Sequence, residues 1–144
     1  MEKKTLAKIL TYSGILPFIA CAVYVVFADD IPFVQISAMD VLLAYGAIIA
    51  SFIAGIHWGI YLFKDALLNL FIHSNVIALL AWGSLLFPPL MSAGILILCF
   101  GYLLVIDRSV FQAGIYEDWF YQLRLHASCA VIGSLMLAII ALLF

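Results

Sequence analysis

The chain has 144 residues, of which 68% are hydrophobic and 10% are charged, and its mean hydropathy is +1.27. Soluble domains are about 45–50% apolar and about 25% charged, so this composition excludes an ordinary soluble domain. The formal net charge is −2 and no basic stripe runs along the sequence, which argues against nucleic-acid binding. We therefore expect a single membrane domain that covers residues 1–144.

Apolar runs divide the chain into five predicted membrane spans. An acidic loop that contains Pro32 follows the first run, and Pro88-Pro89 forces a turn after the third, since neither residue can donate a helical hydrogen bond. The runs show no alternation with a period of two, which favours a helix bundle over a barrel. The fold class is therefore all-α, with spans near 6–28, 41–63, 67–87, 90–106 and 123–144.

The basic residues give the predicted bundle a direction. With five crossings, all six fall on one side of the membrane: Lys3, Lys4, Lys8, Lys64, Arg108 and Arg124. The other side carries only Asp29, Asp30 and Asp40. Lys and Arg are retained on the cytoplasmic side, which predicts a cytoplasmic N-terminus and a periplasmic C-terminus. No Arg/Ser-rich transit segment is visible, which favours the inner membrane of a bacterium.

Small residues mark two predicted helix-packing faces. The second span carries one at every fourth position, and the fifth span repeats the pattern, so each set forms a stripe along one helix face. Small residues let helices approach closely in lipid. The predicted packing residues are Ala47, Ser51, Gly55, Gly59, Ala130, Ser134 and Ala138. The contact predicted is within the bundle or with a partner subunit.

Three histidines lie near the predicted cytoplasmic ends of the spans. His57 and His73 are about six residues inside their spans and His126 about three, or roughly 5–10 Å below one face at 1.5 Å per residue. Ionisable residues inside a membrane usually face the bundle interior or a cavity. We therefore predict a ligand site at His57, His73 and His126 with Trp58 and Arg124. Its predicted polar rim is Arg124, Asp107, Arg108, Lys64 and Asp65.

The chemistry of such a site stays open at the level of sequence. Facing histidines ligate haem, and neutral imidazoles bind metals, hydrogen-bond a quinone head group or relay protons. None of the supporting motifs is present: there is no HExxH, no CxxCH and no carboxylate within the predicted spans. Histidines that simply bond between helices explain the pattern equally well. The three cysteines, Cys21, Cys99 and Cys129, are predicted to be free, since no CxxC or Cys/His pairing is present.

Several short motifs resemble a family of small, uncharacterised integral-membrane proteins of bacteria and mitochondria that includes transmembrane protein 69. The most specific block is Ser51-Phe52-x-x-Gly55-Ile56-His57-Trp58-Gly59, and the others are Gly14-x-x-Pro17-Phe18, Tyr45-Gly46 and Trp119-x-x-x-Leu123-Arg124. The resemblance implies five helices and an energy-conserving inner membrane. It implies no catalytic residue, because no activity is assigned to that family.

The sequence thus favours a non-enzymatic accessory or interaction subunit that packs through its small-residue faces, against itself or in a larger membrane complex. An alternative is a binding protein for a hydrophobic ligand or cofactor, quinone or haem, at the histidines. A second alternative is a small oligomeric transporter.

Overall fold

The computed structural model describes residues 2–28, 36–64 and 69–144. The predicted acidic loop at Asp29 and Asp30 and the predicted rim residue Asp65 lie outside the described residues. The described chain forms helices wherever the sequence is continuously apolar. Their bounds are α1 Lys3–Phe27, α2 Ala38–Phe63, α3 Leu70–Ser84, α4 Pro89–Gln112 and α5 Asp118–Leu143.

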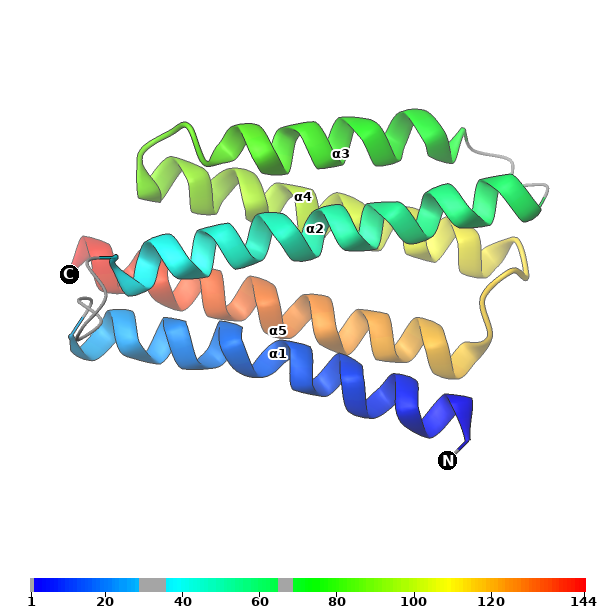
Figure 1. The fold of residues 1–144 in the computed structure, drawn as a ribbon, viewed down its shortest axis with the longest axis horizontal. Helices are drawn as coiled ribbons and strands as arrows, with labels where there is room; N and C mark the ends of the chain where they lie inside the picture. The colour runs from blue at the N-terminus through cyan, green and yellow to red at the C-terminus, as the bar shows by residue number, and fades with distance from the viewer. Residues whose placement is uncertain (1, 29–35, 65–68) are drawn as a thin grey trace.

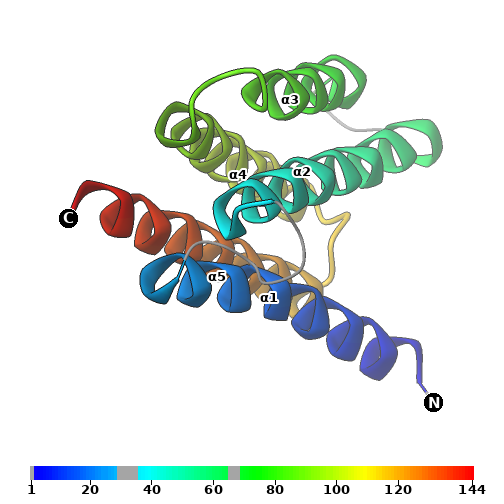
Figure 2. The same cartoon turned by 60° about the vertical axis from the view of Figure 1, so that its left-hand side comes forward.

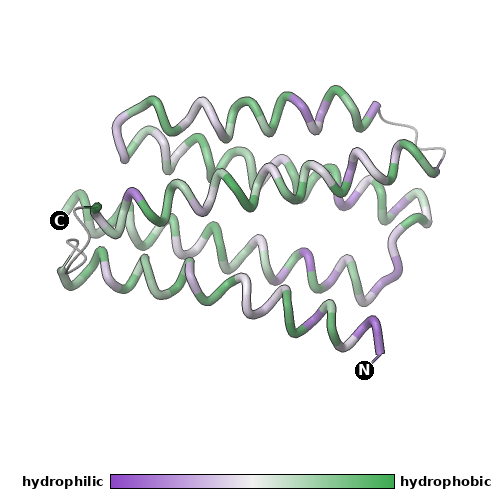
Figure 3. The backbone as a smooth tube through the Cα atoms, in the orientation of Figure 1, coloured by the Kyte–Doolittle hydropathy of each residue, from purple (hydrophilic) through white to green (hydrophobic). Residues whose placement is uncertain are grey.

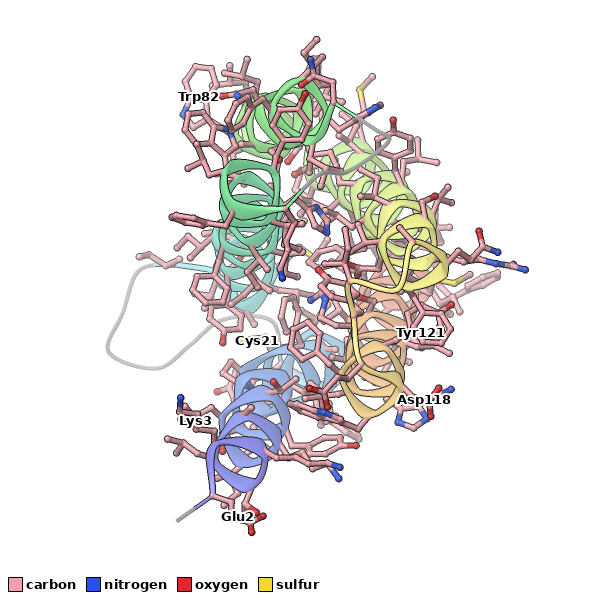
Figure 4. The ribbon with its side chains drawn as sticks, turned by 90° about the vertical axis from the view of Figure 1, so that its right-hand side faces the viewer. Glu2, Lys3, Cys21, Trp82, Asp118 and Tyr121 are labelled. Atoms are coloured by element: carbon pink, nitrogen blue, oxygen red, sulfur yellow. The ribbon has the colours of Figure 1, made fainter. Side chains whose placement is uncertain are left out.

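The helices pack in three layers (Figures 1 and 2). α1 and α5 form one layer, α2 and α4 form the middle layer, and α3 lies on the outer side of both α2 and α4. α1 and α5 begin at the same end of the bundle, and α2 and α4 finish at that end (Figure 1). Figure 4, a view from this end, shows Lys3 at the start of α1 and Asp118 at the start of α5.

Four of the described helices, α1, α2, α4 and α5, are long and apolar enough to cross a membrane. α3 is apolar but has only 15 residues, which gives a length of about 22 Å against a hydrocarbon core of about 30 Å. It nevertheless runs alongside α2 and α4 between the two ends of the bundle (Figure 1). The predicted all-helical membrane class is confirmed, with four candidate spans and one shorter apolar helix.

Local signals fix where the helices begin and end. The Ser37 side chain accepts a hydrogen bond from the backbone N–H of Asp40 and caps α2, and Asn69 caps α3 in the same way through the N–H of Ile72. α4 starts at Pro89, whose missing N–H is not needed in a first helical turn. After α4 the chain turns at Gly114, which has a φ of 72°, a left-handed conformation that favours glycine.

The core contains residues of all five helices, and one aromatic cluster in it joins α1, α2 and α4. Phe18 is fully buried and packs edge-on against Phe100, with ring centroids 6.2 Å apart. Gly46 faces both helices, because a Cβ atom added there would lie 3.1 Å from the Leu96 side chain and 3.7 Å from Phe18. A glycine is therefore what lets α2 approach this cluster.

The outer surface is as apolar as the core. Large side chains such as Leu16, Ile48 and Leu98 are more than 60% exposed, and the hydropathy colouring shows apolar residues along all the helices, with polar ones gathered toward the end where α1 begins (Figure 3). Soluble monomers rarely expose apolar patches larger than a few hundred Å². The exterior is thus suited to lipid, and the polar groups inside the bundle stand out against it.

Candidate functional site

A buried carboxylate, that of Asp107, is the centre of the main polar cluster in the described part of the bundle. One oxygen, Oδ1, lies 2.8 Å from Nε2 of His57 and accepts a 3.3 Å hydrogen bond from the hydroxyl of Tyr116. The other oxygen, Oδ2, accepts hydrogen bonds from Nε and Nη2 of Arg124 at 3.1 and 2.8 Å. We call these four residues the Asp107 cluster. It joins α2, α4, α5 and the segment between α4 and α5.

The antiparallel arrangement of the helices brings the cluster together. His57 and Asp107 lie about five or six residues before the ends of α2 and α4, and Arg124 lies about six residues after the start of α5. At 1.5 Å per residue, all three are roughly 8–9 Å inside the same end of the bundle. Residues that are far apart in sequence therefore meet at one depth.

Burial of the cluster costs free energy, because its charged groups are removed from water. His57 and Asp107 are fully buried, and the Arg124 residue is only 6% exposed. A buried charge is tolerated when it is paired and its remaining hydrogen-bonding capacity is filled. Asp107 meets both conditions, since each carboxylate oxygen has two partners. Tyr116 lies outside the helices, and its burial, together with the nearby Asp107 carboxylate, raises the pKa of its hydroxyl well above the ordinary value.

Two buried polar atoms near the cluster have no hydrogen-bond partner among the described residues: Nδ1 of His57 and Oγ of Ser128. Buried polar groups are nearly always paired, so each unpaired one calls for an explanation. Ser128 lies one helical turn after Arg124 on α5 and is 1% exposed. Its unpaired hydroxyl therefore lies on the same side of α5 as the Arg124 guanidinium.

A groove of about 450 Å³ lies between α1, α2 and α5 and reaches the Asp107 cluster at one end. Its walls are apolar over most of their length, and Arg124 and Ser128 are among its lining residues. On α1 it extends from Ala7 to Phe18, or roughly 16 Å. Leu10 and Phe52 line it and are 62% and 68% exposed, so the groove opens on the outer surface of the bundle.

The hydroxyl of Tyr45 lies in the wall of this groove. It donates a 3.1 Å hydrogen bond to the carbonyl oxygen of Gly14, and its ring packs 4.9 Å from that of Phe18. This bond ties α2 to α1 across the groove. The polar wall groups that are left without such a partner are therefore concentrated at the Arg124 end.

The predicted ligand-binding residues are separated in the structure. His57 and Arg124 come together through Asp107, as described above. His73 is half-buried on α3 and bonds to the hydroxyl of Tyr102 on α4 through Nδ1, at 2.5 Å. His126 is exposed on α5. The three histidines therefore do not share one site.

The other predicted site residues lie at the surface. Trp58 is 43% exposed and packs against the ring of Phe71 on α3, with centroids 4.6 Å apart. The predicted rim residues Arg108 and Lys64 are exposed. No group of three or more His, Cys, Asp or Glu side chains suited to a metal ion occurs among the described residues. The cysteines Cys21, Cys99 and Cys129 are free thiols.

The predicted packing residues are divided between the interior and the surface. Ala47, Ser134 and Ala138 are buried in the bundle, and Ser51 and Ala130 are half-buried. Gly55 is exposed, and a Cβ atom added at Gly55 or Gly59 would meet nothing within 4 Å. The glycine part of the α2 stripe thus faces away from the other helices of this chain.

The sequence placed Asp107 in a polar link after residue 106, whereas α4 continues through it to Gln112. The signal for this was present: Leu103, Ile106 and Val110 continue the buried face of α4 on both sides of Asp107. The second charged residue, Arg108, outweighed this signal, because two adjacent charged residues usually mark the end of a membrane span. Ser128 carried no signal in the sequence, since one serine among apolar residues is usually satisfied by its own helix.

An apolar exterior, helices of membrane-spanning length and a buried ion pair between helices together define a helical integral-membrane protein. The chain belongs to the family described as "Protein of unknown function (DUF3429)", whose model matches residues 3–140. This confirms the resemblance inferred from the motifs.

Two relatives are similar over most of this chain. Mouse transmembrane protein 69 is 28% identical over 137 residues, which cover 91% of this chain and 54% of that protein. Transmembrane protein 69 of Xenopus tropicalis is 27% identical over 136 residues, which cover 88% of this chain and 51% of that protein. The chain thus spans about half the length of these relatives. No solved structure matches it.

Proposed function

We propose that this protein binds a hydrophobic ligand in the groove between α1, α2 and α5, with the polar part of the ligand at Arg124 and Ser128. The observation that carries the proposal is the groove itself: an apolar cavity of about 450 Å³ with unpaired hydrogen-bonding capacity at one end. Ligand sites in proteins are typically cavities of about 300–1,000 Å³ with mostly apolar walls and a few polar groups.

The chemistry of the groove favours a quinone-type ligand over haem. Haem iron is held by His, Cys, Met or Tyr. Of these, only Tyr45 lines the groove, and its hydroxyl is already bonded to the carbonyl of Gly14. His57 has its Nε2 on Asp107 and is not in the groove wall. A ligand that needs hydrogen bonds rather than iron ligation suits the groups that are present.

The location proposed for this activity is the inner membrane of a bacterium, with five crossings, a cytoplasmic N-terminus and a periplasmic C-terminus. The five helices run in alternating directions (Figure 1), which supports this topology, with α3 as a short crossing. The distribution of the six basic residues supports the direction, because all belong to segments at the end of the bundle where α1 begins (Figure 1). The groove would then open to the lipid of the cytoplasmic leaflet.

The test is the lipid content of the purified protein. We would purify it in a mild maltoside detergent, record oxidised and dithionite-reduced spectra, and analyse the organic extract by mass spectrometry. The variant Ala127→Phe fills the groove, since Ala127 lines it, and Cys129→Phe is the matched control on the exposed face of α5. A lipophile retained by the wild type and Cys129→Phe but lost from Ala127→Phe supports the proposal. Equal lipid content in all three proteins contradicts it.

A role as an accessory or interaction subunit is the second candidate, and the exposed glycines favour it. Gly55 and Gly59 leave open space on α2, which would let a helix of a second copy or of a larger membrane complex approach closely. Substituting either with leucine should reduce the yield of cross-linked or co-purified assemblies at least severalfold. Gly133→Leu is the control, because Gly133 also has open space around it but lies on α5. Unchanged assembly in Gly55→Leu and Gly59→Leu would exclude this face as the interface.

A further inference from the structure

The hydroxyl of Ser128 differs from those of the other buried serines of the described helices, each of which has a hydrogen-bond partner. Serines in apolar helices usually donate to the carbonyl oxygen one turn earlier. Ser51, Ser109 and Ser134 do this at 2.9, 3.1 and 2.9 Å, and Ser74 does so too. Ser128 is 1% exposed, lines the groove and has no partner. Its hydroxyl is therefore free to bond to something inside the groove.

Arg124 supplies a second donor beside it. Both of its described hydrogen bonds, from Nε and Nη2, end on the same oxygen of Asp107. A guanidinium has five N–H groups, so Nη1 remains for a ligand in the groove that Arg124 lines. Arg124 and Ser128 lie on successive turns of α5, with an axial rise of about 6 Å between the two residues, and both line the groove.

The charge of Arg124 already has its counter-ion. The guanidinium is paired with the Asp107 carboxylate, which also contacts Nε2 of His57. An anionic head group would add a charge without a counter-ion. An uncharged hydrogen-bond acceptor would add no charge.

We infer that the polar end of the groove binds an uncharged head group that carries a carbonyl oxygen, which accepts hydrogen bonds from Arg124 and Ser128. The inference rests on the proposed function and narrows its ligand to one chemical class. The groove holds on the order of 15 non-hydrogen atoms at roughly 30 Å³ each. That is enough for a quinone ring with the start of its isoprenoid tail, or for the ester group of a glycerolipid with part of one acyl chain.

Charged membrane lipids fit this end less well. A fatty-acid carboxylate or a phosphodiester bound to Arg124 would bring a second anion close to the Asp107 carboxylate, and the two like charges would repel each other. A carbonyl oxygen uses only the donors that the pair leaves free, so it should be selected over an anion of equal length.

The experiment is calorimetric titration of the purified protein in maltoside micelles with four probes. These are a benzoquinone with a decyl tail, dioctanoylglycerol, palmitate and dodecane. We expect the two carbonyl compounds to bind at least tenfold more tightly than palmitate and dodecane. Ser128→Ala should weaken their binding about three- to tenfold, which is the loss of one neutral hydrogen bond. Ser134→Ala is the matched control, because its hydroxyl already bonds to the Ala130 carbonyl and is outside the groove wall.

The outcomes separate the head-group inference from the proposed function. If all four probes bind equally and Ser128→Ala has no effect, the head-group inference is overturned, although loss of binding in Ala127→Phe would keep the groove as a ligand site. If palmitate binds best, the charge argument is wrong. If no probe binds, both proposals fail. Tighter binding of the quinone or of the glycerolipid tells which source supplies the carbonyl.

Discussion

Replacing Asp107 with leucine removes the acceptor of every described hydrogen bond in its cluster. The main consequence is a guanidinium left buried without its carboxylate, for which about 3–5 kcal/mol of lost stability is expected. Arg124→Leu leaves the carboxylate with only His57 and Tyr116, and a loss of similar size is expected. In the double variant both charges are absent and two leucines fill the space.

The double variant should therefore lose no more stability than either single variant, which corresponds to an interaction free energy of about 3–5 kcal/mol. The assay is reversible unfolding in mixed micelles with increasing dodecyl sulfate, followed by circular dichroism. Arg108→Leu is the control, because Arg108 is exposed and adjacent to Asp107, and it should change stability by less than about 0.5 kcal/mol. If the double variant loses as much stability as the two single variants together, the claim that Asp107 and Arg124 act as a pair is refuted.

Two further predictions concern other parts of the bundle. Gly46→Leu should lower stability by at least about 2 kcal/mol in the same assay, because a Cβ at Gly46 already lies 3.1 Å from Leu96, whereas Gly55→Leu, in open space, should unfold like the wild type. The raised pKa of the Tyr116 hydroxyl means that its contribution is complete below the ordinary tyrosine value of about 10 and decreases as pH rises through its higher folded-state pKa. Stability measured from pH 8 to 11 should therefore fall less steeply in Tyr116→Phe, and equal slopes would show that this hydroxyl titrates normally.

The sequence was sufficient to predict the helices, because long apolar runs allow no other structure in lipid. It also indicated His57 and Arg124 as site residues, since ionisable side chains in such runs are costly and usually have a partner. It named Asp107 only as a residue of the polar rim and did not pair it with these two side chains. The position of Asp107 depends on where α4 ends, and a charged pair at residues 107–108 is also what the end of a span looks like.

The separation of the histidines could not have been predicted from depth alone. The sequence predicted similar depths for His57, His73 and His126, but the directions of their side chains depend on which helices are neighbours. His73 faces Tyr102 because α3 packs against α4, and that packing is set by the layers rather than by local sequence. The groove was unpredictable for the same reason, since residues of four helices, α1, α2, α4 and α5, line it.

The Asp107 cluster also has a consequence for the order in which the bundle is built. Synthesis proceeds from the N-terminus, so α2 and α4 emerge from the ribosome before α5. Until α5 arrives, His57 is the one described residue on a preceding helix that contacts the Asp107 carboxylate, and a carboxylate without its counter-ion is expensive in lipid. Burying the end of α4 in the bundle therefore becomes favourable chiefly once α5 packs against it and Arg124 pairs with Asp107. A chain truncated before α5 would keep this carboxylate without its counter-ion. Membrane quality control could then recognise the unpaired carboxylate as a feature of an incomplete chain.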